Sequence, residues 1–216
     1  MKRILTSIAL VASAVSLMAQ GTVNYNIRVS GIVVGHVYGS SGTGPLDSRS
    51  GNTTGETPIG TQVYATPVLQ GSGFSAQLFS VNLADQAEGG LVAVATSLTT
   101  FRTGATLGGT IATSIQTIPN VPIGGTGTFQ LRVWDNLGGT VTSWTAAAPL
   151  WNNGLGTLAA GKSALFNIAN LGDPVTFPAD MVNFKSFNLT SSVPEPSTFV
   201  LAGLGAAGLL IFRRRK

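Results

Sequence analysis

Apolar and polar residues alternate along the central part of this chain with the period of a β-strand. In the segment 129–134 every second residue is apolar, and Gln130, Arg132 and Trp134 lie between these positions. Successive side chains of a strand point to opposite faces of its sheet. The alternation therefore predicts a strand with one face against the core and the other face toward water.

Similar runs, rich in Val, Ile, Thr and aromatic residues, recur between Gly, Asn, Pro and Ser residues. They are Thr22–Val29, Ile32–Tyr38, Gln62–Leu69, Phe74–Val81, Leu91–Phe101, Thr110–Ile118, Thr128–Asp135, Val141–Ala146, Ala164–Ile168 and Val182–Leu189. Such runs predict short strands. No apolar pattern of period 3.6 persists long enough to predict a core helix, although Leu83–Glu88 has room for one turn.

We therefore expect an all-β body, an antiparallel β-sandwich of the jelly-roll or immunoglobulin-like type. A parallel sheet would need long helical crossovers, which the sequence lacks. An eight-stranded outer-membrane barrel is the alternative, but it needs strands of about ten residues, and most of the runs are shorter. The segment Gly39–Gly60 is rich in Gly, Ser and Thr, and we expect it to form a long exposed loop.

The N-terminal segment has the layout of a secretion signal. Lys2 and Arg3 precede the apolar stretch Ile4–Leu17, and Ala19 offers a small residue for cleavage, with Ala14 as the alternative. This order predicts a signal peptide over residues 1–19 that engages the Sec translocon and signal peptidase.

A second apolar segment lies near the C-terminus. As a helix, residues 197–212 would cover about 24 Å, which is shorter than the usual hydrocarbon core of about 30 Å. The basic residues that follow, Arg213, Arg214, Arg215 and Lys216, stay in the cytoplasm by the positive-inside rule. We therefore predict a single hydrophobic helix that holds the exported precursor in the inner membrane.

The residues before this helix are Val193, Pro194, Glu195, Pro196 and Ser197. Together with the helix and the basic end, they resemble the PEP-CTERM sorting signal over residues 192–216. An ordinary C-terminal anchor with a chance Pro-Glu-Pro is the alternative. The resemblance implies recognition by an exosortase, a membrane-embedded cysteine transpeptidase. It also implies a link to exopolysaccharide and biofilm production, and a final place at the cell surface or outside the cell.

Charge and cysteine content narrow the function of the body, which we place at residues 20–191. The whole chain carries a formal charge of +4, but residues 21–192 hold six cations and seven acids, for a net charge of about −1. The excess of basic residues thus lies at the two ends of the chain and gives no support for nucleic-acid binding by the body. With no cysteine, the body depends on a packed core rather than on disulfides.

One motif in the body matches a nucleotide site by pattern alone. Gly156–Ser163 fits the P-loop spacing. However, no buried strand precedes it, and the residues after it alternate like a strand rather than open a helix. We therefore expect a structural turn at Gly161 and Lys162 that leads into the strand Ala164–Ile168.

Candidate chemistry elsewhere in the body is sparse. His36 is the only histidine, and the seven acids form no motif, so we expect no catalytic residue, no metal site and no cofactor. Trp134, Trp144 and Trp151 could stack on sugar rings, although tryptophan in a small β-domain more often belongs to the core. The sequence thus favours a non-enzymatic envelope or matrix protein. A carbohydrate-binding module with a Trp/Asn-rich edge is the alternative, and a secreted hydrolase is the third possibility.

Overall fold

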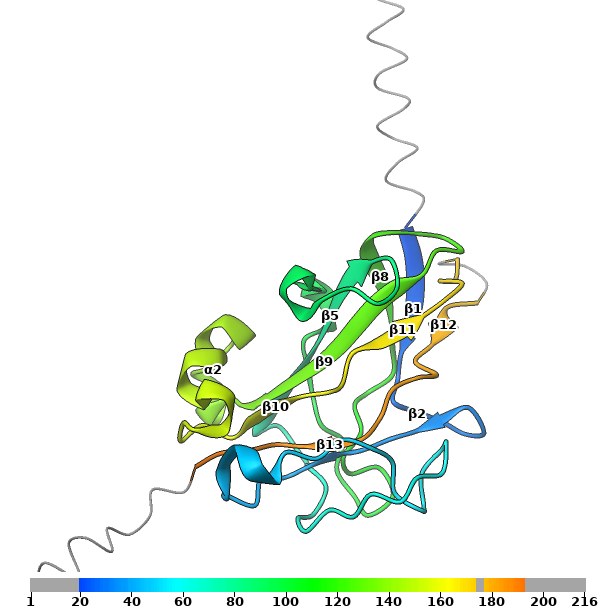
Figure 1. Ribbon diagram of the computed structural model, residues 1–216. Helices are drawn as coiled ribbons and strands as arrows, with labels where there is room; N and C mark the ends of the chain where they lie inside the picture. Colours follow the sequence, from blue (N-terminus) through cyan, green and yellow to red (C-terminus); the bar gives the residue numbers. More distant parts are fainter. Residues whose placement is uncertain (1–19, 174–176, 193–216) are drawn as a thin grey trace, which may run out of the picture.

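The computed structural model describes residues 20–173 and 177–192. Figure 1 shows two sheets packed against each other, with a short helix, α2 (Trp144–Trp151), on one side. The first sheet has the order β12-β1-β8. Its strands are β1 (Gln20–Tyr25), β8 (Ser114–Pro122) and β12 (Ala179–Asp180). The all-β prediction is confirmed, and the layered arrangement is that of a sandwich.

The second sheet has the order β10-β9-β5-β6, with β11 also paired to β9 and β7 also paired to β5. Its strands are β5 (Phe74–Asn82), β6 (Val92–Ala93), β7 (Thr99–Thr100), β9 (Gly127–Asp135), β10 (Ala160–Lys162) and β11 (Phe166–Ile168). Strands β5 and β9 pair antiparallel over their full length, from Phe74 opposite Asp135 to Asn82 opposite Gly127. This pair is the structural centre of the body.

Smaller elements complete the described chain. Two strand pairs, β2 (Arg28–Val29) with β3 (Val33–Val34) and β4 (Val37–Tyr38) with β13 (Phe187–Asn188), flank the sheets. The 3-10 turns are η1 (Gly44–Asp47), η2 (Glu88–Gly90), η3 (Ala95–Ser97), η4 (Leu137–Gly139) and η5 (Asn152–Gly154). The segment Leu83–Glu88, which has room for one helical turn, contains only the first residue of η2.

The main hydrophobic core fills the space between the two sheets. Tyr25 and Ile118 from the first sheet and Leu78, Phe129 and Leu131 from the second are all fully buried in it. Most of the favourable free energy of folding therefore comes from burying this apolar surface, at roughly 25 cal/mol per Å². This is the core on which a cysteine-free domain must depend.

Two strand pairs depart from the expected antiparallel arrangement. β12 runs parallel to β1, and β13 runs parallel to β4. The last part of the body thus returns along its first part. Parallel neighbours need a long connection, and here it is the rest of the body rather than a crossover helix.

The prediction that one face of β9 is exposed to water was wrong. Gln130, Arg132 and Trp134 are as inaccessible as the apolar residues on the opposite face, with at most 8% of any of them exposed. Part of the cover comes from α2, which packs on β9, and part from Phe79 and Glu88, which contact Arg132. A strand sequence shows its own alternation but not what packs over it.

The strand expected over Val141–Ala146 was also wrong, because a helix, α2 (Trp144–Trp151), begins in this segment. The hydroxyl of Ser143 caps the helix by accepting the Ala146 N–H, and Asn152 ends it in the left-handed conformation at φ 45°. A third predicted strand, Gln62–Leu69, contributes only an isolated bridge between Val68 and Tyr38. Pro67 within it cannot donate to a ladder.

Candidate functional site

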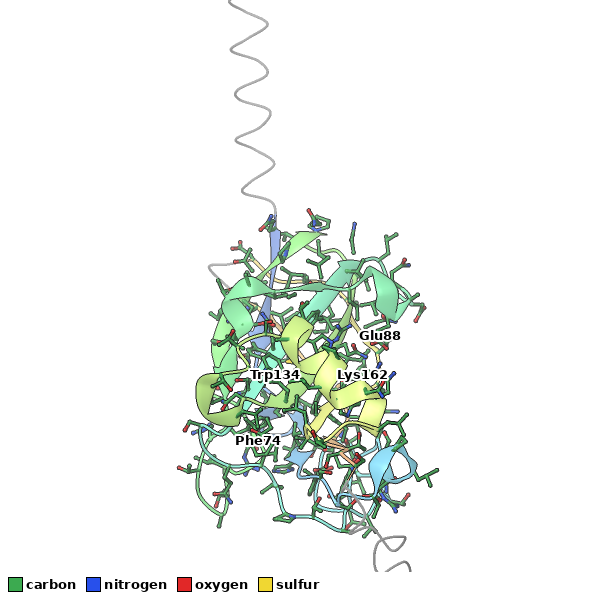
Figure 2. The ribbon with its side chains drawn as sticks, turned by 90° about the vertical axis from the view of Figure 1, so that its left-hand side faces the viewer. Phe74, Glu88, Trp134 and Lys162 are labelled. Carbon is green, nitrogen blue, oxygen red and sulfur yellow. The ribbon has the colours of Figure 1, made fainter. Side chains whose placement is uncertain are left out.

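A cluster of charged side chains covers the outer face of the second sheet. Lys162 Nζ lies 2.8 and 3.0 Å from the two carboxylate oxygens of Glu88. Arg132 Nη2 is 3.6 Å from the same carboxylate. Arg132 and Lys162 are direct register partners on β9 and β10, so one acid from η2 pairs with two neighbouring cations. Figure 2 shows Glu88 and Lys162 beside each other on one side of the body.

Arg132 is held between aromatic rings. Its guanidinium carbon lies 4.0 Å from the centre of the Phe79 ring and 5.3 Å from that of Trp144. Its Nε donates to Gln130 at 2.8 Å. Burial lowers the pKa of Arg132, and the nearby Glu88 carboxylate acts in the opposite direction. The side chain thus stays a charged, desolvated part of the structure.

The three tryptophans come together, as a second core cluster rather than as an exposed edge. Trp144 lies between the other two, with ring centres 6.1 Å from Trp134 and 5.5 Å from Trp151. Trp134 is fully buried and donates its indole N–H to the Val141 carbonyl. It is therefore unavailable to a glycan, which corrects its place among the candidate contacts.

Trp151 is the tryptophan of this cluster that lines a pocket. The pocket has a volume of about 280 Å³. The polar residues that line it are Ser48, Glu88, Gln130, Lys162, Ser163, Asn188 and Thr190. The indole N–H of Trp151 donates to Thr190 Oγ1 at 2.9 Å, which fixes the ring. The pocket thus combines one aromatic wall with charged, amide and hydroxyl groups, the side-chain types found where polyhydroxylated molecules bind.

The segment Gly156–Ser163 does not have the geometry of a P-loop. Its residues Ala160–Lys162 form strand β10 against β9. The backbone N–H of Ser163 donates to the Leu131 carbonyl at 2.9 Å, and the Ser163 hydroxyl oxygen accepts the Leu131 N–H at 3.0 Å. The backbone groups that would bind a phosphate in a P-loop instead form hydrogen bonds between strands. The expected turn at Gly161 and Lys162 was wrong, because both residues are already in the strand.

A polar network missed at the sequence level surrounds Glu56. Its Oε1 accepts a hydrogen bond from His36 Nδ1 at 2.8 Å and from the Tyr38 hydroxyl at 3.1 Å, and its Oε2 accepts the Thr53 N–H at 2.6 Å. Only 3% of Glu56 is exposed. Gly39–Gly60 is therefore not simply an exposed loop, since Glu56 and Asn52 are buried.

The pKa values in this network follow from burial and charge. Burial alone would raise the pKa of Glu56, but the hydrogen bonds from His36 and the Thr53 backbone outweigh it and lower the pKa. Burial, and then the Glu56 carboxylate, raise the pKa of Tyr38 to about 12. The pKa of Tyr64, which stacks on Tyr38, is raised by the same causes. The network is thus one ionised acid surrounded by donors.

Within residues 20–173 and 177–192, no group of three or more His, Asp or Glu side chains is placed to hold a metal ion. The helices of these two ranges are also too short or too polar to cross a membrane. The helix predicted near the C-terminus and the signal peptide over 1–19 lie outside them.

The end of the described chain is bonded firmly to the body. Thr190 exchanges two backbone hydrogen bonds with Ala160, at 2.8 and 3.1 Å. The carbonyl of Ser191 accepts the N–H of Gly44 at 2.9 Å, and the N–H of Ser192 donates to the carbonyl of Gly156 at 2.8 Å. The folded body therefore extends to Ser192 itself, with no linker before Val193.

Comparison with protein families addresses the residues that follow. Residues 192–216 match the model described as the PEP-CTERM protein-sorting motif. The chain carries a PEP-CTERM sorting signal. A PEP-CTERM tail implies export and a membrane-anchored precursor that an exosortase, a membrane enzyme, recognises and processes. No curated protein and no solved structure matches the chain.

The PEP-CTERM match covers the predicted sorting residues Val193, Pro194, Glu195, Pro196 and Ser197 and the basic end Arg213–Lys216. All of these lie outside the described residues. The signal for them is in the sequence itself, whereas the Glu88–Lys162 and His36–Glu56 pairs arise only when distant segments fold together.

Proposed function

We propose that the body, residues 20–191, is a non-enzymatic component of the cell envelope or the extracellular matrix. In this proposal the signal peptide over residues 1–19 directs export, and an exosortase then processes the tail over residues 192–216. The observation that carries the proposal is the PEP-CTERM motif at the very end of the chain. Proteins with PEP-CTERM tails tend to accompany exopolysaccharide production, which supports a role alongside exopolysaccharide, as in a biofilm matrix.

The environment of the acidic residues supports a structural role for the body. Glu88 is bonded to Lys162, Glu56 is buried among donors, and Asp47 pairs with Arg49 at 3.0 Å. A general acid or base needs a pKa close to the working pH. The hydrogen bonds from His36 and the Thr53 backbone instead outweigh the effect of burial and lower the pKa of Glu56, so this acid stays ionised.

The test is a double substitution in the sorting motif, Pro194→Ala with Glu195→Ala. We expect export to continue, because the N-terminal signal is separate, and the protein to accumulate in the inner membrane as an unprocessed precursor. Fractionation and immunoblotting measure this. Asp85→Asn, which removes a negative charge from the body instead, is the matched control and should be processed normally. Normal release of the double variant would refute the proposal.

A second candidate, carbohydrate binding, is favoured by the pocket beside Trp151. Lys162 and Gln130 carry donors and Glu88 carries acceptors around one aromatic wall, a combination that suits a sugar ring. A glycan array tests it, with Glu88→Gln expected to abolish binding and Asp85→Asn, outside the pocket, expected to preserve it. Absence of glycan binding by the wild-type protein, or equal binding by Glu88→Gln, would refute this candidate.

A further inference from the structure

Three exposed leucines belong to the segments that contact the last described residues. Leu46 in η1 is 96% exposed, Leu155 after η5 is 64% exposed and Leu150 in α2 is 48% exposed. Single exposed apolar residues are ordinary on protein surfaces. Ile59 and Phe177, at 80% and 83% exposure, are examples elsewhere on this body. The position of the three leucines, rather than their exposure, is the informative feature.

Each leucine lies next to a group that binds the last two described residues. The Leu155 carbonyl accepts the Ser192 hydroxyl at 2.9 Å. Leu46 is two residues from Gly44, whose N–H donates to Ser191. A Cβ at Gly156, which also binds Ser192, would lie 1.8 Å from the Leu150 carbonyl, so only glycine allows this approach. In Figure 1, η1 (cyan) and α2 lie beside the orange end of the chain.

The chain length after this point places the membrane close to these leucines. Five residues separate Ser192 from Thr198, where the uninterrupted apolar run of the tail begins. Even a fully extended chain spans at most about 3.5 Å per residue, so this stretch reaches no more than about 20 Å. Because Ser192 is bonded to the body, this end of the body is confined near the bilayer surface as long as the tail is inserted.

We propose that, in the anchored precursor, the body rests on the lipid surface through the patch formed by Leu46, Leu150 and Leu155. The inference depends on the proposed membrane-anchored precursor. Three leucines alone bind a bilayer weakly, but an inserted tail makes the contact intramolecular, with a high effective concentration. Asp47, the acid next to Leu46 in the sequence, is paired with Arg49.

This docking would give the body a fixed orientation when the exosortase meets residues 193–197. The end of β5 and β9 that lies near α2 would face the membrane, and the other end, near Leu83 and Gly127, would point away from it. The nine-residue strands β5 and β9 separate the two ends by about 30 Å. Leu83 is 62% exposed, which makes it a matched control for Leu155.

Fluorescent labels at single cysteines test the proposal, because the chain has no cysteine of its own. Leu46→Cys, Leu155→Cys and Leu83→Cys would each be made in the full chain, produced without an exosortase and labelled with an environment-sensitive dye. The proteins would be reconstituted into vesicles of phosphatidylethanolamine and phosphatidylglycerol that contain spin-labelled lipid as a quencher. We expect a blue shift and severalfold stronger lipid quenching at positions 46 and 155 than at 83.

Quenching at positions 46 and 155 no stronger than at 83 would overturn the proposal. A blue shift without lipid quenching would also overturn it, because a protein surface such as a second copy would then cover the patch. Flotation of the vesicles separates this failure from a failure of the proposed function. A chain that does not float with the vesicles would refute both the anchored precursor and the docking, whereas a floating chain without selective quenching would refute only the docking.

Discussion

Removal of the Glu56 carboxylate tests how the segment 39–60 is held to the body. Glu56 accepts hydrogen bonds from His36 Nδ1, the Tyr38 hydroxyl and the Thr53 N–H. A carboxylate can only accept, so the His36 ring must donate from Nδ1. Glu56→Ala leaves three donors without an acceptor in a site where only 3% of the residue is exposed.

The expected cost follows from these contacts. A buried donor left without its partner costs about 1–3 kcal/mol, and three donors lose their acceptor here. Because the donors partly relax toward water, we expect Glu56→Ala to lower the free energy of unfolding by about 3–5 kcal/mol. Glu56→Gln keeps the volume and one acceptor oxygen, and should cost about 1–3 kcal/mol.

The same carboxylate gives a pH signature. Its pKa in the folded protein is lowered from the ordinary value of 4.5. Its stabilising contribution is therefore complete above pH 4.5 and is lost as the pH falls through the lowered pKa. The stability difference between the wild type and Glu56→Gln should shrink below pH 4.5. The pKa of Asp47 is also lowered, by the Ser41 hydroxyl and Arg49, but this acid is present in both proteins and cancels.

Urea unfolding of residues 20–192, followed by tryptophan fluorescence across a pH series, measures both effects. Tyr64→Phe is a control in the same network, because it removes a hydroxyl that contacts backbone carbonyls rather than Glu56. It should show the same pH dependence as the wild type. A cost of about 0.5 kcal/mol or less for Glu56→Ala, the size typical of surface substitutions, would refute the reasoning.

Three further substitutions test other parts of the structure. Lys162→Ala should cost about 1 kcal/mol or less, because its ion pair with Glu88 is partly exposed. The wild-type melting temperature should not rise with ATP and magnesium. A rise that Lys162→Ala abolishes would indicate that Gly156–Ser163 binds nucleotide as a P-loop. Phe166→Ala should cost about 3–5 kcal/mol in urea unfolding, since its buried ring packs on Phe129 and Phe184; a cost below about 1 kcal/mol would contradict its core position. Tyr25→Phe should leave stability unchanged or raise it by about 1 kcal/mol, because the hydroxyl has no partner among the described residues; a clear loss would indicate a bound water.

The two central strands could be predicted almost to the residue. We expected strands at Phe74–Val81 and Thr128–Asp135, and β5 and β9 occupy Phe74–Asn82 and Gly127–Asp135. Both segments are long, and their alternation of apolar side chains is a local property that survives folding. The tail was predictable for a similar reason, since the PEP-CTERM motif is a contiguous sequence.

The predictions that were wrong concern features that depend on contacts between residues far apart in the chain or on short local signals. The second face of β9 is buried by Phe79 and Glu88 as well as by α2, and the pairing of Lys162 with Glu88 joins residues 74 positions apart. Neither follows from the pattern of one strand. Helix α2 has only eight residues. In so short a segment the apolar positions do not distinguish the period of a helix from that of a strand. The Ser143 cap before an alanine run was the signal that could have identified it.

The intact mass of the protein isolated from its native host is the most direct test of export and processing at the tail. We expect a product that lacks residues 1–19 and the apolar and basic part of the tail after the motif, with the body complete through Ser192. A mass that retains residues 197–216 in most molecules would contradict processing and indicate an ordinary C-terminal anchor.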